Sequence, residues 1–182
     1  MIASTYSTKY PLRVDVVIPA FNEENAVGQV IRELPMAYVR EVVVVNNNSN
    51  DHTRQNALAA GATVLDEPRQ GYGYACLCGI AYLRAKSSPP DVVGFLDADY
   101  SDYPEELSLL VDTLVNEELA MVIGSRALGA RQRGAMTPQQ IFGNWLATTL
   151  IHLLYGVRYT DLGPSSAFRL DVLSYLGMND TT

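Results

Sequence analysis

The sequence predicts an α/β fold with a mostly parallel central sheet flanked by helices. Short, valine-rich apolar runs alternate with longer segments of mixed polarity along much of the chain, which is typical of parallel strands joined by right-handed crossovers. Several runs end abruptly in polar residues, and ligands bind at the carboxyl ends of strands in open α/β sheets. At 182 residues, the chain has the length of one domain with a sizeable core.

Residues 1–124 of this single domain carry the alternation of strands and helices. The predicted strands are Val14–Pro19, Glu41–Val45, Thr63–Leu65, Val92–Leu96 and Ala120–Gly124. Their β-branched content suits strands that are buried on both faces. The predicted helices end near Leu34, Ala60, Lys86 and Glu118. Gly61 can close the second helix, and Pro104 suits the first turn of the fourth.

Residues 125–182 depart from this alternation. A basic loop is followed by a long apolar helix from Thr137 to about Tyr155 and a short strand at Val157–Asp161. A turn or hairpin is predicted at Leu162–Arg169, and a helical fragment at Asp171–Leu176. The long helix suits either a membrane surface or a cover over the core, because hydrophobic periodicity does not separate the two.

Composition excludes several classes of function. The net charge of −7 argues against general nucleic-acid binding. Cys76 and Cys78 are expected to be buried, reduced thiols, since no matching Cys/His pair for a metal site exists. No run reaches the roughly 18 apolar residues of a membrane span. We therefore expect a cytoplasmic protein with at most peripheral contact at the inner membrane face.

The strand Val92–Leu96 leads directly into an Asp-x-Asp motif. Asp97 and Asp99 flank the small Ala98, so both carboxylates can reach one centre. Two hard oxygen ligands suit Mg²⁺ or Mn²⁺, which substrate phosphates usually help to hold. The alternative is a solvated turn with acidic caps for the helix near Pro104, and the motif alone favours neither reading.

Several motifs, in this order along the chain, resemble the family 2 glycosyltransferases, which have the GT-A (Rossmann-like) fold. These motifs are Val17–Glu24, Asn46–Thr53, Gly71–Ala75 and Leu96–Asp99. Within the family, Gly124–Arg126 and Thr160–Pro164 are similar to the dolichyl-phosphate mannose synthase-like branch. The resemblance extends from about Val14 onwards. It implies a nucleotide-sugar-binding half, residues 1–124, and an acceptor-side half, residues 125–182, that we expect to be incomplete.

The resemblance also implies residue roles. Pro19, Phe21 and Glu23 would line the nucleoside pocket, and Asn47 would accept a hydrogen bond from the base, where the family usually has aspartate. Asp97 and Asp99 would hold the metal, with Ser101 as a further ligand. The remaining residues of the expected donor site are Arg69, Gly73, Ala98, Arg126, Arg131, Arg133 and Arg169. The family often has a lysine at the position of Tyr72, and Arg69 would supply this missing positive charge. Ser166 stands where the branch has an arginine.

The function implied is inverting, metal-dependent transfer of a hexose from GDP-mannose or UDP-glucose, with Asp99, Arg126 and Asp161 as catalytic residues. Polyprenyl phosphate is the expected acceptor, because an anionic phosphate needs no general base. The alternative is a truncated nucleotide-sugar-binding domain without transfer activity. A Rossmann dehydrogenase is disfavoured, since no Gly-x-Gly-x-x-Gly follows the first strand. The sequence assigns no oligomeric state.

Overall fold

The computed structural model describes residues 12–124 and 165–175. A six-stranded sheet in the order β3-β2-β1-β4-β6-β5 forms the central layer. The strands are β1 (Val14–Ala20), β2 (Val39–Asn46), β3 (Thr63–Asp66), β4 (Val92–Phe95), β5 (Met121–Ile123) and β6 (Ser166–Arg169). β1 pairs in parallel with β2 and β4, and β2 pairs in parallel with β3. The predicted α/β fold with a mostly parallel sheet is therefore confirmed.

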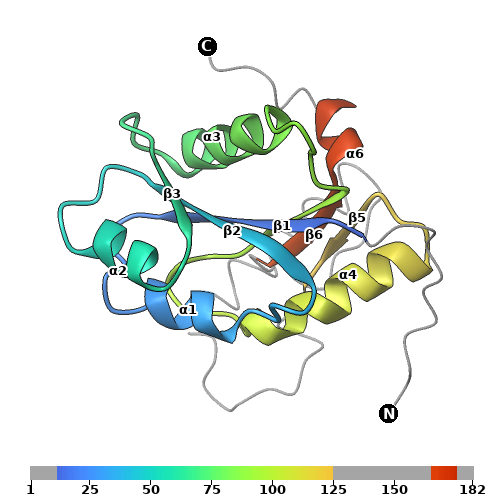
Figure 1. Cartoon of the computed structure of the whole chain (residues 1–182), viewed down its shortest axis with the longest axis horizontal. Helices are drawn as coiled ribbons and strands as arrows, with labels where there is room; N and C mark the ends of the chain where they lie inside the picture. Colours follow the sequence, from blue (N-terminus) through green and yellow to red (C-terminus); the bar gives the residue numbers. More distant parts are fainter. Residues whose placement is uncertain (1–11, 125–164, 176–182) are drawn as a thin grey trace, which may run out of the picture.

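Helices cover both faces of the sheet (Figure 1). They are α1 (Val27–Glu33), α2 (Thr53–Ala59), α3 (Tyr72–Arg84), the 3₁₀ helix η1 (Pro104–Glu106), α4 (Leu107–Asn116) and α6 (Leu170–Tyr175). α3 and α6 lie over one face, whereas α1, α2 and α4 lie over the other. In the ranges 12–124 and 165–175, no helix is long and apolar enough to cross a membrane.

Two apolar clusters form the core, one on each face of the sheet. Val16 and Ile18 of β1 pack toward α1 and α4, whereas Val17 packs toward α3 with Ile80 and Leu83. All residues of β1 are buried, which explains why the apolar run Val16–Ile18 is continuous rather than alternating. The double cover leaves the ends of the strands as the places where the sheet can meet a ligand.

β6 corrects the prediction of a turn or hairpin at Leu162–Arg169. Ser166–Arg169 is a strand that lies between β4 and β5 and pairs antiparallel with both. This strand is only four residues long and carries a polar residue at each end, so it has no clear β pattern of its own. Its neighbours in the sheet determine its conformation. The helix expected at Thr137–Tyr155 and the strand expected at Val157–Asp161 lie outside the described residues.

Candidate active site

A cleft of about 390 Å³ opens at the carboxyl ends of β1, β2 and β4. The parallel registers bring these ends together, because Ala20 pairs with Asn46 and Val17 pairs with Phe95. The residues that line the cleft are Pro19, Ala20, Phe21, Glu23, Asn47, Gln70, Gly71, Tyr72, Ala75, Asp97, Ala98 and Asp99. The structure thus places Pro19, Phe21, Glu23, Asn47 and the Asp97–Asp99 motif around one cleft.

The acidic loop, residues 97–102, follows β4, and its first three residues line the cleft. Asp97 is half-buried, Ala98 is buried and Asp99 is exposed. The Oδ1 atom of Asp99 accepts a hydrogen bond from the backbone N–H of Ser101 at 2.9 Å. Ser101 is not among the cleft residues, so its contact with the acidic pair runs through the backbone rather than through the predicted metal-ligand hydroxyl.

Two residues that follow the acidic pair, Tyr100 and Asp102, form hydrogen bonds with other parts of the fold. The hydroxyl of Tyr100 donates a hydrogen bond to Glu33 of α1. Asp102 Oδ2 accepts hydrogen bonds from the backbone N–H of Ser165, at 3.0 Å, and from its hydroxyl. Tyr100 also has a φ of 61°, a left-handed conformation that is uncommon for a bulky residue and often found at functional loops. The acidic loop therefore has a fixed shape.

Negative charge is concentrated in the cleft. The pKa of Glu23 is raised above its ordinary value, first by burial and then by the carboxylates of Asp99, Asp51 and Asp97. No salt bridge within residues 12–124 and 165–175 involves Glu23 or Asp99. Such a donor set fits a hard divalent cation.

In the same described ranges, no three His, Cys, Asp or Glu side chains come close enough to hold a metal ion by themselves. A cation at this acidic pair would need further ligands from water or a substrate. Mg²⁺ sites commonly have this character, with one or two carboxylates and substrate phosphates.

The β1–α1 loop forms one wall, and the asparagine-rich segment Asn46–Asp51 holds it in place. The Asn22 N–H donates to Ser49 Oγ at 3.0 Å, and the Asn50 N–H donates to Asn22 Oδ1 at 3.0 Å. The Glu23 N–H donates to Thr53 Oγ1 at 2.7 Å. These contacts hold the ring of Phe21, which is 45% exposed, and the Glu23 carboxylate at the cleft.

The start of α3 and the two residues before it form another part of the cleft lining, which we call the α3 wall. Gln70, Gly71, Tyr72 and Ala75 line the cleft, although none of them was expected to be a site residue. Desolvation by the surrounding atoms raises the pKa of Tyr72, although the residue is 56% exposed, and the nearby Cys76 and Asp97 raise the pKa further. Tyr72 thus remains a protonated donor beside Asp97. The sequence signal for this position was the resemblance, in which the family often has a lysine where Tyr72 stands.

The two cysteines lie on α3 as free thiols, as expected. Burial raises the pKa of Cys76 to about 12, and burial also raises the pKa of the half-buried Cys78. A raised pKa disfavours the reactive thiolate. Both residues therefore behave as packing residues of this helix.

Gly73 and Arg69 lie close to the cleft but are not among its lining residues. Gly73 is in the first turn of α3. The Arg69 guanidinium donates to both carboxylate oxygens of Glu67, each at 3.0 Å, and lies 4.7 Å from the centre of the Tyr74 ring. Arg69 is thus paired with a buried carboxylate, and its expected role as a replacement for the missing lysine stays a prediction.

The structure does not bring Arg169 to the cleft. Because β6 runs antiparallel to β4, Arg169 pairs with Val92 at the start of β4, whereas Ser166 pairs with Phe95 at its end. The donor-site role of Arg169 was implied by the resemblance alone. Arg126, Arg131, Arg133 and Asp161 lie outside the described residues, so their predicted roles stay predictions.

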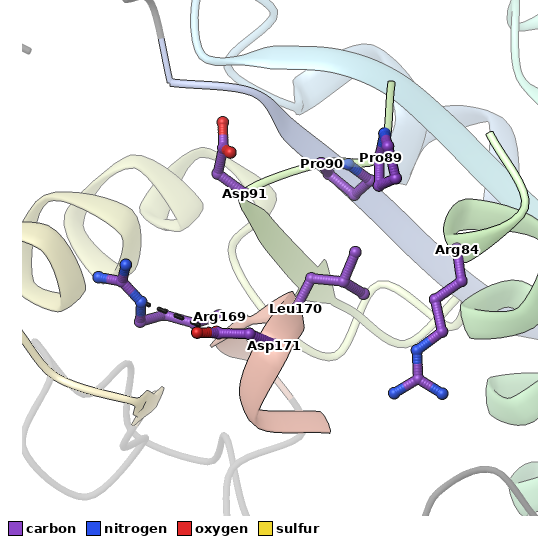
Figure 2. Close-up of a pocket in the computed structure, with 7 residues that line it drawn as sticks. All are labelled: Arg84, Pro89, Pro90, Asp91, Arg169, Leu170 and Asp171. Carbon is purple, nitrogen blue, oxygen red and sulfur yellow. Dashed lines mark ion pairs between the residues drawn. The ribbon is translucent and has the colours of Figure 1, made fainter. Parts of the chain in front are cut away.

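Arg169 instead lines a second pocket, of about 420 Å³, at the opposite end of β4 (Figure 2). The Arg84 and Arg169 guanidinium groups extend on opposite sides of this pocket. Arg169 Nε lies 3.9 Å from Asp171, and Asp91 pairs with Arg13 at 2.7 Å. The two arginines do not converge on a common centre, so this pocket does not resemble an anion site.

An open, mostly parallel α/β sheet with an acidic pair after its fourth strand is typical of the GT-A fold, and in such sheets ligands bind at the carboxyl ends of the strands. The chain belongs to glycosyl transferase family 2, whose model matches residues 15–177. The predicted family is thereby confirmed.

Individual relatives agree with this assignment. Over 153 residues, which are 81% of this chain and 36% of the relative, the chain is 32% identical to the low-salt glycan biosynthesis hexosyltransferase Agl6 of Haloferax volcanii. It is 26% identical to a dodecaprenyl-phosphate galacturonate synthase of Rhizobium johnstonii, over 90% of this chain and 49% of the relative. The chain thus spans about half or less of these relatives.

Among solved structures, the fold matches glucosyl-3-phosphoglycerate synthase from Mycobacterium tuberculosis in complex with Mn²⁺, UDP-glucose and phosphoglyceric acid. The TM-score is 0.70 at 25% identity, and the match covers 90% of this chain and 58% of that chain.

Proposed function

We propose that this chain binds a nucleotide-diphospho-sugar in the cleft and transfers its hexose to a phosphate-bearing acceptor. The observation that carries the proposal is the convergence of Phe21, Glu23 and the Asp97–Asp99 motif around one cleft at the carboxyl ends of β1 and β4. Membership of family 2 and the Mn²⁺–UDP-glucose complex of a structural relative support it. They favour UDP-glucose over GDP-mannose as the first donor to test.

The β1–α1 side of the cleft suits the nucleoside. Pro19 and Phe21 offer apolar surface, and the Phe21 ring is sufficiently exposed to stack on a base. Glu23 lies on the same wall, where its carboxylate can accept hydrogen bonds from ribose hydroxyls. These residues would bind and orient the donor without taking part in bond cleavage.

Asp97 and Asp99 would hold Mg²⁺ or Mn²⁺ together with the donor diphosphate. When bound, such a cation supplies positive charge that neutralises the leaving diphosphate. The N-terminus of the 13-residue helix α3 begins at the cleft wall, and its N–H groups and dipole favour an anion there. The Tyr72 hydroxyl can donate a further hydrogen bond. Arg126, Arg131 and Arg133 would add positive charge at the donor diphosphate or at the acceptor phosphate.

Transfer would proceed with inversion, by attack of the acceptor oxygen on the anomeric carbon opposite the diphosphate. The acceptors in the names of two relatives, phosphoglycerate and dodecaprenyl phosphate, both carry a phosphate. The phosphate oxygen of a polyprenyl phosphate is already anionic near neutral pH, so with this acceptor Asp161 need not act as a base. A polyprenyl phosphate at the inner membrane face is our preferred acceptor, in keeping with the dolichyl-phosphate mannose synthase-like motifs.

Replacement of Asp99 tests the donor site. Asp99→Asn should weaken Mn²⁺-dependent binding of UDP-glucose, measured by titration calorimetry, by about tenfold or more, because a charged oxygen ligand is lost. Asp171→Asn is the matched control, since Asp171 is an exposed aspartate at the opposite end of β4. Unchanged binding in Asp99→Asn would refute the metal assignment.

Turnover separates the enzyme from a binding domain. Labelled UDP-glucose with Mn²⁺ should transfer its sugar to polyprenyl phosphate faster than to phosphoglycerate. Transfer to phosphoglycerate alone would replace the acceptor assignment. Binding without transfer or slow hydrolysis would establish a nucleotide-sugar-binding domain instead.

A further inference from the structure

Asn47 makes three hydrogen bonds to one backbone segment, residues 67–71. Its Nδ2 donates to the carbonyl oxygens of Glu67, at 3.0 Å, and Arg69, at 2.7 Å. Its Oδ1 accepts from the N–H of Gly71 at 2.7 Å. The residue is only 4% exposed. Both donor hydrogens of the amide are therefore used, and its orientation is set by partners that only an amide can satisfy together.

The segment that Asn47 holds leads into the α3 wall of the cleft. Gln70, Gly71 and Tyr72 line the cleft directly. Gly71 has a φ of 145°, in the region that favours glycine, so the turn into α3 has an unusual backbone shape. The Glu67–Arg69 pair closes the segment on its other side, with the Arg69 N–H donating to Glu67 Oε1 at 2.9 Å. Asn47 thus connects the end of β2 to the shape of this wall.

We infer that Asn47 is a positioning residue that shapes the α3 wall of the donor cleft, rather than a hydrogen-bond acceptor for the nucleobase. The inference rests on the proposed function, since the cleft is taken to hold the donor. An aspartate at this position has no donor hydrogens, and it would direct a carboxylate at the Glu67 and Arg69 carbonyl oxygens. Such repulsion in a buried place would move the segment away.

The two roles of Asn47 predict opposite effects for Asn47→Asp. If the side chain accepted a hydrogen bond from the base ring, a charged carboxylate would accept it more strongly and tighten nucleotide binding. If the side chain holds the segment 67–71, the same substitution removes its donors and deforms the cleft. The sign of the change in affinity therefore separates the roles.

The experiment measures the dissociation constants of UDP and GDP, each with Mn²⁺, by titration calorimetry. Asn47→Asp should weaken binding of both nucleotides by about tenfold or more, because buried hydrogen bonds are lost. Asn48→Asp is the control, since it adds the same charge one residue away on an exposed side chain outside the cleft lining. It should leave both constants within about twofold. Equal or tighter binding in Asn47→Asp would overturn the inference.

A second measurement is independent of nucleotide binding and of the folding of Asn47→Asp. Amide hydrogen exchange in the unmodified chain should show protection at Gly71, because its N–H donates to Asn47 Oδ1. Asn47→Ala should lose that protection while the α3 amides near Ile80 remain protected. Unprotected Gly71 in the unmodified chain would overturn the inference. If the unmodified chain bound neither nucleotide although Gly71 was protected, the proposed function would fail and the role of Asn47 in holding the segment would stand.

Discussion

Gly79 determines how closely α3 approaches the sheet beneath the cleft. A Cβ atom at this position would lie 2.5 Å from Cγ1 and 3.0 Å from Cγ2 of Val17, a fully buried residue of β1. Real Cβ contacts are not this short, so either the helix or the strand would have to move. The absence of a side chain at Gly79 is therefore a packing requirement.

Gly79→Ala should accordingly lower the free energy of unfolding by about 1–3 kcal/mol, the usual cost of overpacking a core. Gly73→Ala in the same helix is the matched control, because its Cβ would have no neighbour within 4 Å. This control should leave the free energy unchanged or raise it by up to about 1 kcal/mol through helix propensity. Denaturant titration measures both values, and equal stability of the two variants would contradict the packing argument.

At the same scale, the sequence indicated the position of polar residues but not their partners. The polar residues of Asn46–Asp51 were expected at the edge of the sheet where a nucleotide would bind, with Asn47 as the contact residue. In the structure, Ser49, Asn50 and Asp51 bind the loop that carries Phe21 and Glu23. In a sequence, a residue that contacts a ligand looks the same as one that contacts a neighbouring loop, because the residue type and the spacing can be identical. Only the distances between loops separate the two.

At the scale of elements, the acidic loop is tied to the start of β6. Asp102 is half-buried and accepts two hydrogen bonds from Ser165, one from the backbone and one from the hydroxyl. Ser165 directly precedes β6, which pairs with β4. The contact thus fixes the loop that follows β4 against the strand beside it, a few residues from Asp99.

The single variants Asp102→Ala and Ser165→Ala and their double variant test this tie. Their effects on the free energy of unfolding should be non-additive by about 0.5–3 kcal/mol, as is typical of residues in direct contact. Asp102→Ala should also weaken Mn²⁺-dependent nucleotide binding more than Ser108→Ala, a control on α4 whose hydroxyl donates to the carbonyl oxygen of Glu105 in η1. Additive effects on the free energy of unfolding would show that the hydrogen bonds between Asp102 and Ser165 contribute nothing to stability.

The elements also show why some of the fold could be predicted and some could not. β1 and β4 were expected within a residue or two of their observed bounds, because valine-rich runs and the polar residues after them signal buried parallel strands. β6 lacks such a run, and its place depends on pairing with β4 and β5. Arg169 was assigned to the donor site by resemblance, whereas its strand places it at the opposite end of β4 from the cleft.

At the scale of the whole molecule, charged side chains are arranged differently at the two ends of the sheet. At the amino end, the fully buried Asp15 accepts hydrogen bonds from Arg40 at 2.8 Å and from Lys86 at 3.0 Å. Lys86 also binds Glu41. These charges compensate one another, as buried ion pairs must. At the carboxyl end, Glu23 has a raised pKa among neighbouring carboxylates. This contrast supports the proposal that a cation binds at the carboxyl end of the sheet.

The central claim is that one cation and one nucleotide diphosphate share the cleft between Phe21 and the Asp97–Asp99 motif. The most direct measurement is anomalous scattering from crystals of the chain grown with Mn²⁺ and UDP. The account predicts a manganese peak within about 2.5 Å of an Asp99 carboxylate oxygen, with the uracil beside Phe21. A nucleotide bound in the pocket of Arg84 and Arg169, or manganese away from both aspartates, would contradict it.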